Sequence, residues 1–116
     1  MRTVEPGWPG APGEDAPARI AIVEDDYLVA SAMEEALAEA GFDVVALASS
    51  AEEILDLAAT ARPTLAVMDI RLNGARDGID AALELFANHE IRCVFATAYQ
   101  TREMRARAEP ARPLAW

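Results

Sequence analysis

A short apolar run over residues 65–68, which ends at the carboxylate of Asp69, is the feature that most constrains the fold of this chain. A continuous apolar run of this length is typical of a strand that is buried on both faces of a parallel sheet. A second run of the same kind covers residues 20–23 and ends in three acids, residues 24–26. In open parallel sheets ligands bind at the carboxyl ends of the strands. We therefore expect a ligand site at the sheet edge where these acids meet.

The carboxylates at the two strand ends predict a cation site. If the strands are neighbours, up to four carboxylates come close together, and so much negative charge is stable only beside a cation. Ligand sets made of oxygen alone favour Mg²⁺ or a similar hard ion. The pattern therefore indicates a metal-assisted phosphoryl-transfer site with Asp69 at its centre.

The composition indicates one globular domain with an acidic surface. The 116 residues are 53% hydrophobic and carry a formal net charge of −10, and all ten basic residues are arginine. Because there is no basic stripe to displace counterions from phosphate, direct binding to nucleic acid is not expected. A charge of this sign fits solubility and a protein partner.

The single cysteine and the single histidine of the sequence do not indicate a second functional site. Cys93 is the one cysteine, which excludes a disulfide framework and a thiolate metal site, and its apolar neighbours predict buried packing. His89 lies outside any cluster of metal ligands and is expected at the surface. The sequence shows neither a signal peptide nor an apolar span long enough for a membrane, and we expect a cytoplasmic location.

Strand and helix patterns alternate along the chain, which predicts an α/β fold with a doubly wound parallel sheet. Asp26, Ser50 and Asp77 are expected to cap helices, and Glu53 to complete a capping box with Ser50. The expected strands cover residues 20–23, 42–48, 65–69 and 92–96, with a fifth opening at 114–116. The expected helices cover residues 27–40, 50–61, 78–88 and 101–108.

The first of these helices is expected to bury one apolar stripe at three- and four-residue spacing. Its members are Val29, Met33, Ala36, Leu37 and Ala40. Gly41 is expected to end the helix as its C′ residue.

The first 18 residues differ in composition from the rest. They hold four of the seven prolines and three of the six glycines, with few large apolar residues. Such a segment cannot bury enough apolar surface to order itself. We expect a disordered leader over residues 1–18 and one folded domain over residues 19–116.

Polar groups at three strand ends form a specific combination: Glu24 and Asp25 after the first strand, Asp69 after the third and Thr97 after the fourth. On this combination the chain, from about Arg19 to its last residue, resembles the receiver domain of bacterial two-component response regulators. The matching motifs are Val23-Glu24-Asp25-Asp26, Met68-Asp69-Ile70-Arg71, Asp77-Gly78 and Phe95-Ala96-Thr97-Ala98-Tyr99.

The resemblance implies a five-stranded flavodoxin-like sheet in the order 2-1-3-4-5. It implies that Asp69 accepts a phosphoryl group from a sensor histidine kinase or a phosphotransfer protein, and that a downstream protein partner receives the signal. Asp25, Asp69 and the main-chain carbonyl of Arg71 would ligate Mg²⁺, with Glu24 acting mainly through water. Thr97 would contact a phosphoryl oxygen. Such a domain is not an enzyme in the usual sense, although it assists its own phosphorylation and dephosphorylation.

Two features depart from the family pattern. Receivers carry a Lys followed by Pro at the end of the fifth strand, whereas this sequence contains no Lys. We also expect an incomplete fifth strand and no last helix. The segment from Phe95 to Tyr99, followed by an Arg- and Pro-rich stretch, resembles an atypical receiver subgroup in which the fourth helix is reduced. Thr97, Tyr99 and Trp116 are the switch candidates. The open C-terminal edge is expected to favour a homodimer, with Trp116 in the contact.

Two alternatives remain open at this point. The first is a pseudo-receiver, an interaction module that keeps the fold without being phosphorylated, and the missing Lys favours it. The second is a phosphohydrolase of the haloacid dehalogenase type, which also ends a strand in a nucleophilic Asp. That family has a second Asp two residues further on, where this chain has Arg71, and also a Lys.

Overall fold

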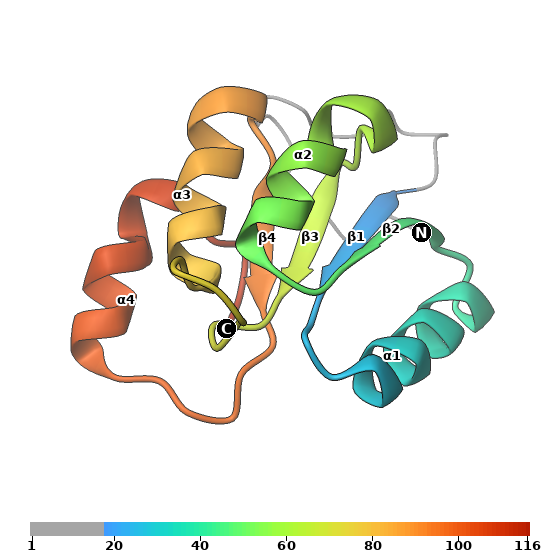
Figure 1. The fold of residues 1–116 in the computed structure, drawn as a ribbon, viewed down its shortest axis with the longest axis horizontal. Helices are drawn as coiled ribbons and strands as arrows, with labels where there is room; N and C mark the ends of the chain where they lie inside the picture. The colour runs from blue at the N-terminus through green and yellow to red at the C-terminus, as the bar shows by residue number, and fades with distance from the viewer. Residues whose placement is uncertain (1–17) are drawn as a thin grey trace.

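Four parallel strands form one sheet in the order β2-β1-β3-β4 (Figure 1). The structure, a computed structural model, describes residues 18–116, so the predicted leader lies outside the described residues except for Ala18. The strands are β1 (Arg19–Val23), β2 (Asp43–Ala48), β3 (Leu65–Met68) and β4 (Arg92–Phe95). The order confirms the predicted flavodoxin-like topology for the first four strands.

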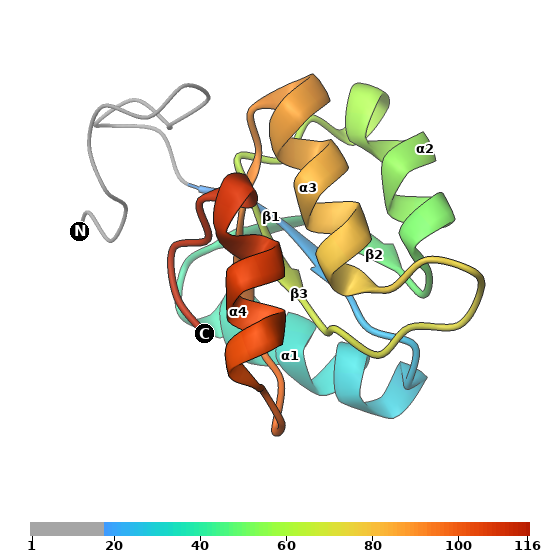
Figure 2. The ribbon, with the colours of Figure 1, turned by 90° about the vertical axis from the view of Figure 1, so that its left-hand side faces the viewer.

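Helices cover both faces of the sheet, as predicted. They are α1 (Tyr27–Glu39), α2 (Ala51–Ala61), α3 (Gly78–His89) and α4 (Arg102–Ala108), which a 3₁₀ turn, η1 (Glu109–Ala111), follows. Figures 1 and 2 show α2 and α3 side by side on one face, α4 beside α3, and α1 on the opposite face. No helix among residues 18–116 is long and apolar enough to span a membrane.

The side-chain alternation of β1 divides the core between the two faces. Ala21 and Val23 pack in the larger cluster beneath α2 and α3, whereas Ile20 and Ile22 pack in the smaller cluster with α1. A strand buried on both faces must be apolar at every position, because successive side chains point to opposite faces. This requirement explains the continuous apolar run that the sequence shows.

The segment after η1 occupies the place of a fifth strand at the edge of β4. The Leu114 amide donates to the Cys93 carbonyl at 2.8 Å, the Phe95 amide donates to the Ala115 carbonyl at 2.9 Å, and Ala115 pairs in parallel with Val94. This isolated bridge is the incomplete fifth strand that was predicted, and no helix follows it within the described residues.

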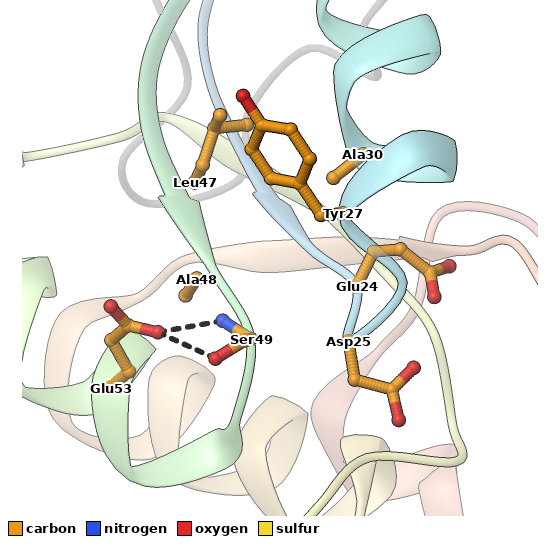
Figure 3. Close-up of a pocket in the computed structure, with 8 residues that line it drawn as sticks. All are labelled: Glu24, Asp25, Tyr27, Ala30, Leu47, Ala48, Ser49 and Glu53. Atoms are coloured by element: carbon orange, nitrogen blue, oxygen red, sulfur yellow. Dashed lines mark hydrogen bonds between the residues drawn. The ribbon is translucent and has the colours of Figure 1, made fainter.

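The three predicted N-caps are confirmed, but the capping box predicted between Ser50 and Glu53 at the start of α2 is wrong. Ser50 accepts from the Glu53 amide at 3.1 Å, while the Glu53 carboxylate accepts from the amide of Ser49 at 2.7 Å and from its hydroxyl at 3.0 Å (Figure 3). Ser49 offers two donors, and the backbone of Ser50 instead forms a bridge with Asn73. The complete capping box belongs to α3, where Asp77 and Asp80 each accept from the other's amide.

The predicted stripe of α1 is wrong in part. Met33 and Leu37 pack against the sheet together with Ala30, which is 4% exposed, whereas Val29 is 43% exposed. The two alanines of the predicted stripe, Ala36 and Ala40, are also exposed. Because α1 is rich in alanine, several stripes look equally apolar in the sequence, and packing on the sheet selects the one with the larger side chains. At α3, the helix runs one residue beyond the prediction, to an exposed His89.

Candidate metal and phosphoacceptor site

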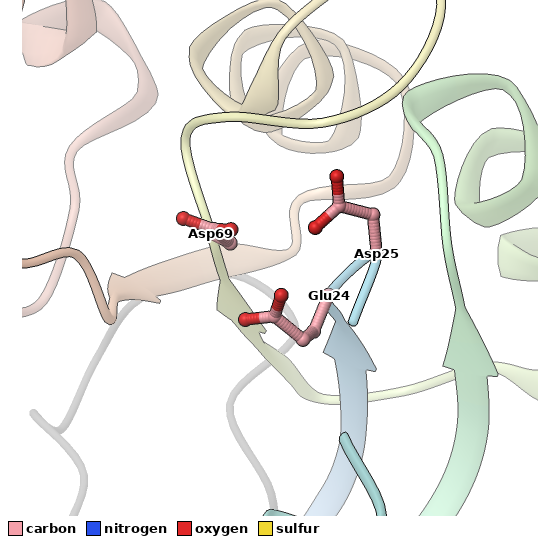
Figure 4. Close-up of side chains that lie close together, drawn as sticks. All are labelled: Glu24, Asp25 and Asp69. Atoms are coloured by element: carbon pink, nitrogen blue, oxygen red, sulfur yellow. The ribbon is translucent and has the colours of Figure 1, made fainter. Parts of the chain in front are cut away.

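Three carboxylates meet at the carboxyl edge of the sheet (Figure 4). Glu24 and Asp25 follow β1, Asp69 follows β3, and one carboxylate oxygen from each lies within 4.8 Å of the others. The Asp69 amide donates to the Val23 carbonyl at 2.9 Å, which fixes the two strand ends beside each other. The predicted convergence of the two acidic strand ends is therefore what the structure shows.

The surroundings of Glu24 and Asp69 oppose the ionisation of these two carboxyl groups. Burial raises the pKa of Asp69 above its ordinary value, and the charge of Asp25 adds to this, while hydrogen bonds from the Arg71 and Ile70 amides act against it. Burial likewise raises the pKa of Glu24, although its carboxylate accepts a hydrogen bond from the Asp26 amide at 3.0 Å. A cation bound between these carboxylates would favour their ionised forms and so oppose the effect of burial.

The donor set fits Mg²⁺. All three donors are carboxylates, the ligands that this hard ion prefers, and opposite ligands around Mg²⁺ lie about 4 Å apart. Three ligands of one octahedral ion include adjacent pairs about 3 Å apart, a spacing that oxygens within 4.8 Å of one another can reach when their side chains rotate. Asp25 is exposed to solvent, while Glu24 and Asp69 are half-buried, so the site is open on one side.

Gly78 holds the loop that follows Asp69. Its amide donates to the Ile70 carbonyl at 2.7 Å, and a Cβ atom at this position would lie 2.0 Å from the Asp69 carbonyl oxygen. Only a residue without a side chain allows the start of α3 to approach so closely. The sequence showed this glycine as part of a family motif, but not why it is required.

Two further contacts attach the site to α4. The Arg107 guanidinium donates to Asp77 at 2.6 Å and to Asp80 at 3.0 Å, the two residues of the α3 capping box. Burial alone would raise the pKa of Asp77, but the bonds from Arg107 and from the Asp80 amide outweigh it and lower that pKa. Sequence reasoning missed Arg107, because its partners lie 30 and 27 residues away.

Thr97 and Tyr99 lie in the loop after β4, bonded to each other. The Thr97 hydroxyl donates to the Tyr99 carbonyl at 3.1 Å, and Tyr99 is 59% exposed. The guanidinium carbon of Arg71 lies 5.9 Å from the centre of the Tyr99 ring. The contact between Arg71 and Tyr99 therefore joins the loop after β3 to the loop after β4.

Trp116 lies at the β4 edge. Its ring centre is 4.5 Å from that of Phe95, with the planes inclined by 30°, and the Arg105 guanidinium carbon is 5.0 Å from its centre. The third switch candidate is therefore packed within the chain, on the strand that leads to Thr97.

A pocket of about 250 Å³ adjoins the acids between α1 and α2 (Figure 3). Beyond Glu24 and Asp25 its walls come from α1, from the end of β2 and from α2, and include Tyr27, Leu47 and the bonded pair Ser49–Glu53. No sequence pattern points to these residues, because they meet only when α1 and α2 are placed on opposite sides of the sheet.

The fold and the acidic edge define a class of protein. The family described as response regulator receiver domain matches residues 20–112, and the chain belongs to it. It is 35% identical over 100 residues to the transcriptional regulatory protein PdtaR of Mycobacterium tuberculosis, covering 86% of this chain and 48% of that protein. It is 33% identical over 99 residues to the phyllosphere-induced regulator PhyR of Methylorubrum extorquens, covering 84% of this chain and 37% of that protein. The chain thus spans about half or less of the length of these relatives.

A solved structure confirms the fold. The signal receiver domain of a modulated diguanylate cyclase from Desulfovibrio desulfuricans superposes with a TM-score of 0.80 at 33% identity, covering 86% of this chain and 79% of that one. The chain is therefore a receiver domain of the two-component signalling family, and the family it matches is not a catalytic one.

Proposed function

We propose that this chain is a phosphoacceptor that takes a phosphoryl group onto Asp69, with Mg²⁺ bound, from a histidine kinase or a phosphotransfer protein. The observation that carries the proposal is the meeting of Glu24, Asp25 and Asp69 with their oxygens within 4.8 Å. The proposed domain covers residues 19–116, in keeping with the family match over residues 20–112.

The reaction is a transfer between two nucleophiles. An Asp69 carboxylate oxygen attacks phosphorus, the bond from phosphorus to the histidine nitrogen of the donor breaks, and the electron pair stays on that nitrogen. The product is an acyl phosphate on Asp69. The Arg71 and Ile70 amides orient the Asp69 carboxylate for the attack.

The bound ion would neutralise the negative charge that the carboxylate and the phosphoryl group bring together. Asp25, Asp69 and the main-chain carbonyl of Arg71 would hold it directly, and Glu24 through water. Thr97 would contact a phosphoryl oxygen, for which its hydroxyl must leave the Tyr99 carbonyl.

Output in this proposal passes through protein contacts. The net charge of −10 opposes direct contact with nucleic acid and fits a cytoplasmic signalling protein with a downstream protein partner. A homodimer through the β4 edge is part of the proposal. There Leu114 and Ala115 pair only briefly, and Trp116 packs on Phe95. Sedimentation at micromolar concentration tests the dimer, and a monodisperse monomer would contradict it.

A pseudo-receiver is the second candidate, because the sequence contains no Lys to contact a phosphoryl group. Incubation with acetyl phosphate and Mg²⁺, followed by mapping with mass spectrometry, separates the two. We expect one phosphoryl group on Asp69, no label in Asp69→Asn and none after chelation of the metal. No label on the unaltered chain would favour the pseudo-receiver, and label that persists at an unrelated residue in Asp69→Asn would refute the assignment.

A further inference from the structure

The loop between β3 and α3 carries main-chain groups that surround Asp69. The Ile70 and Arg71 amides bond to the Asp69 carboxylate, and the Arg71 carbonyl is the main-chain ligand in the proposed function. The Ile70 carbonyl accepts from the Gly78 amide at 2.7 Å, which anchors the beginning of the loop to the start of α3. The position of this loop therefore decides whether a main-chain oxygen can reach an ion beside Asp69.

One arginine joins the far end of this loop to two helices. The Arg76 guanidinium donates to Glu52 of α2 at 3.1 Å and to Glu84 of α3 at 2.7 Å. The two acids come from helices that lie side by side on one face of the sheet (Figure 2). The two branches of one guanidinium thus fasten the loop to α2 and to α3 at the same time.

The middle of the loop also lies against the start of α2. The backbone of Asn73 forms a parallel bridge with that of Ser50, the N-cap residue of α2. Gly74 has φ of +104°, and a Cβ atom there would lie 3.1 Å from Oε1 of Glu52. The other oxygen of this carboxylate, Oε2, accepts from Arg76. Glu52 therefore lies against the loop backbone and binds the arginine with the same side chain.

These ion pairs are exposed, so they contribute little to the stability of the whole domain. The side chains of Arg76, Glu52 and Glu84 are 38%, 47% and 41% exposed. A loop is a different case, because few contacts hold it and its local opening costs little free energy. Ion pairs of modest strength can therefore change the fraction of molecules in which the loop is in place for a ligand.

We propose that Arg76 is a positioning residue for the metal site. Through Glu52 and Glu84 it holds the loop after β3 where the Arg71 carbonyl can ligate Mg²⁺ beside Asp69. Because the loop is already in place, the ion binds without the entropic cost of ordering it. This inference rests on the proposed function, and it adds a residue that acts on the ion through the loop backbone.

The direction of the change in Mg²⁺ affinity separates positioning from a simple effect of charge. If Arg76 acted only through its field, removing its positive charge would tighten Mg²⁺ binding. A loss of positioning weakens it instead. For Arg76→Ala we expect the Mg²⁺ affinity of the full 116-residue chain, measured by calorimetry, to fall about three- to fivefold, the scale of one exposed ion pair.

The rate of phosphorylation by acetyl phosphate gives a second readout. At subsaturating Mg²⁺, Arg76→Ala should react more slowly than the unaltered chain. At saturating Mg²⁺ the two rates should agree to within about twofold, because the bound ion then orders the loop itself.

Hydrogen exchange reports the position of the loop without any ion. In the absence of Mg²⁺, the amides of residues 70–78 should exchange faster in Arg76→Ala than in the unaltered chain, while those of β1 keep their rates. A general loss of stability would speed the exchange of β1 as well. Saturating Mg²⁺ should slow the exchange of the loop again, because the coupling between loop and ion is reciprocal.

Matched variants test whether the ion pairs carry the effect. Arg76→Lys keeps the charge but lacks the planar fork that binds both acids, so its Mg²⁺ affinity should fall between those of Arg76→Ala and the unaltered chain. Glu52→Gln removes one of the two pairs, and its effect should not add to that of Arg76→Ala in the double variant. Arg102→Ala and Asp56→Asn remove exposed charges of α4 and α2 and should bind Mg²⁺ as the unaltered chain does.

The outcomes separate this inference from the proposed function. If the unaltered chain does not bind Mg²⁺, the metal site and the role of Arg76 both fail. If it binds Mg²⁺ and Arg76→Ala binds the ion equally well or more tightly, the role of Arg76 alone fails. Faster exchange in β1 as well as in the loop, or fully additive effects of Arg76→Ala and Glu52→Gln, would also overturn the positioning role.

Discussion

Gly78 lies so close to Asp69 that a Cβ atom at Gly78 would stand 2.0 Å from the Asp69 carbonyl oxygen. The start of α3 is thereby set against the backbone of the residue that we propose accepts the phosphoryl group. Since the same turn contains Asp77, which Arg107 contacts, the site, α3 and α4 form one continuous set of contacts.

Gly78→Ala should displace the Asp69 backbone, because the new methyl group meets backbone atoms that cannot turn away. Overpacking of this kind costs about 1–3 kcal/mol of stability, and a misplacement of about 1 Å at a reacting group can slow its reaction about a hundredfold. Phosphorylation by acetyl phosphate and thermal unfolding measure the two effects.

Gly41→Ala is the control for this substitution. Gly41 has φ of +96°, and a Cβ atom added there would meet nothing within 4 Å, so an alanine suffers backbone strain alone. We expect it to lower stability by about 1–2 kcal/mol and to leave the phosphorylation rate unchanged. A normal rate in Gly78→Ala would show that the loop shifts without moving Asp69.

Asp25 and Asp26 are adjacent, yet their substitution should affect different properties, Mg²⁺ affinity for Asp25 and stability for Asp26. Asp26→Ala removes the cap of α1, where its side chain accepts from the Leu28 amide at 3.0 Å, and should cost about 1 kcal/mol of stability with little effect on Mg²⁺ affinity. Asp25→Ala removes one ligand oxygen from the acidic cluster and should weaken Mg²⁺ binding at least about tenfold. Calorimetric titration decides, and equal losses of affinity would refute the assignment of Asp25.

Asp69→Asn should stabilise the metal-free chain at neutral pH. Because burial raises the pKa of Asp69, the folded state binds more protons than the unfolded state between the ordinary and the raised pKa. The free energy of unfolding therefore falls as the pH rises through that interval, and an uncharged amide avoids this loss. The melting temperatures of the two chains should converge below the ordinary carboxyl pKa.

Mg²⁺ should reverse this order at neutral pH. At a concentration of about 100 times its dissociation constant, a ligand specific for the folded state adds about 2.7 kcal/mol to stability, and Asp69→Asn should gain less. Asp56→Asn, an exposed acid of α2, is the control and should behave as the unaltered chain in both conditions. Equal stabilisation of Asp69→Asn by Mg²⁺ would show that Asp69 is not a ligand.

Arg107→Ala should loosen α4 from α3. Arg107 is partly exposed, so the loss of its bonds to Asp77 and Asp80 should cost less than about 1 kcal/mol. Because the pKa of Asp77 is lowered in the folded chain, this stabilisation is present above the ordinary carboxyl pKa and is lost as the pH falls through the lowered pKa. Urea unfolding at neutral and acidic pH, with Arg102→Ala as the control, measures it. A cost that does not change with pH would show that packing, not charge, joins the helices.

Much of this site could be predicted from the sequence, because the strand ends and helix caps that form it are marked by patterns within a few residues. A parallel strand buried on both faces is a continuous apolar run, so the ends of β1 and β3 were visible as the points where acids follow. Side chains such as Asp26 and Asp77 cap helices through amides two or three residues away, and spacing alone identifies them. The acidic cluster follows from these strand ends and from the parallel pairing.

The tertiary structure determines the contacts between residues that belong to different helices, strands and loops. The face that α1 buries, the close approach of Gly78 to Asp69 and the contacts of Arg107 and Arg71 all join residues that the chain brings together only when helices and loops take their places. The sequence determines which residues begin and end each element, because those signals act within a few positions. The orientation of one element on another is set by the packing of whole surfaces, and for that reason the groups around the acids appeared only in the folded chain.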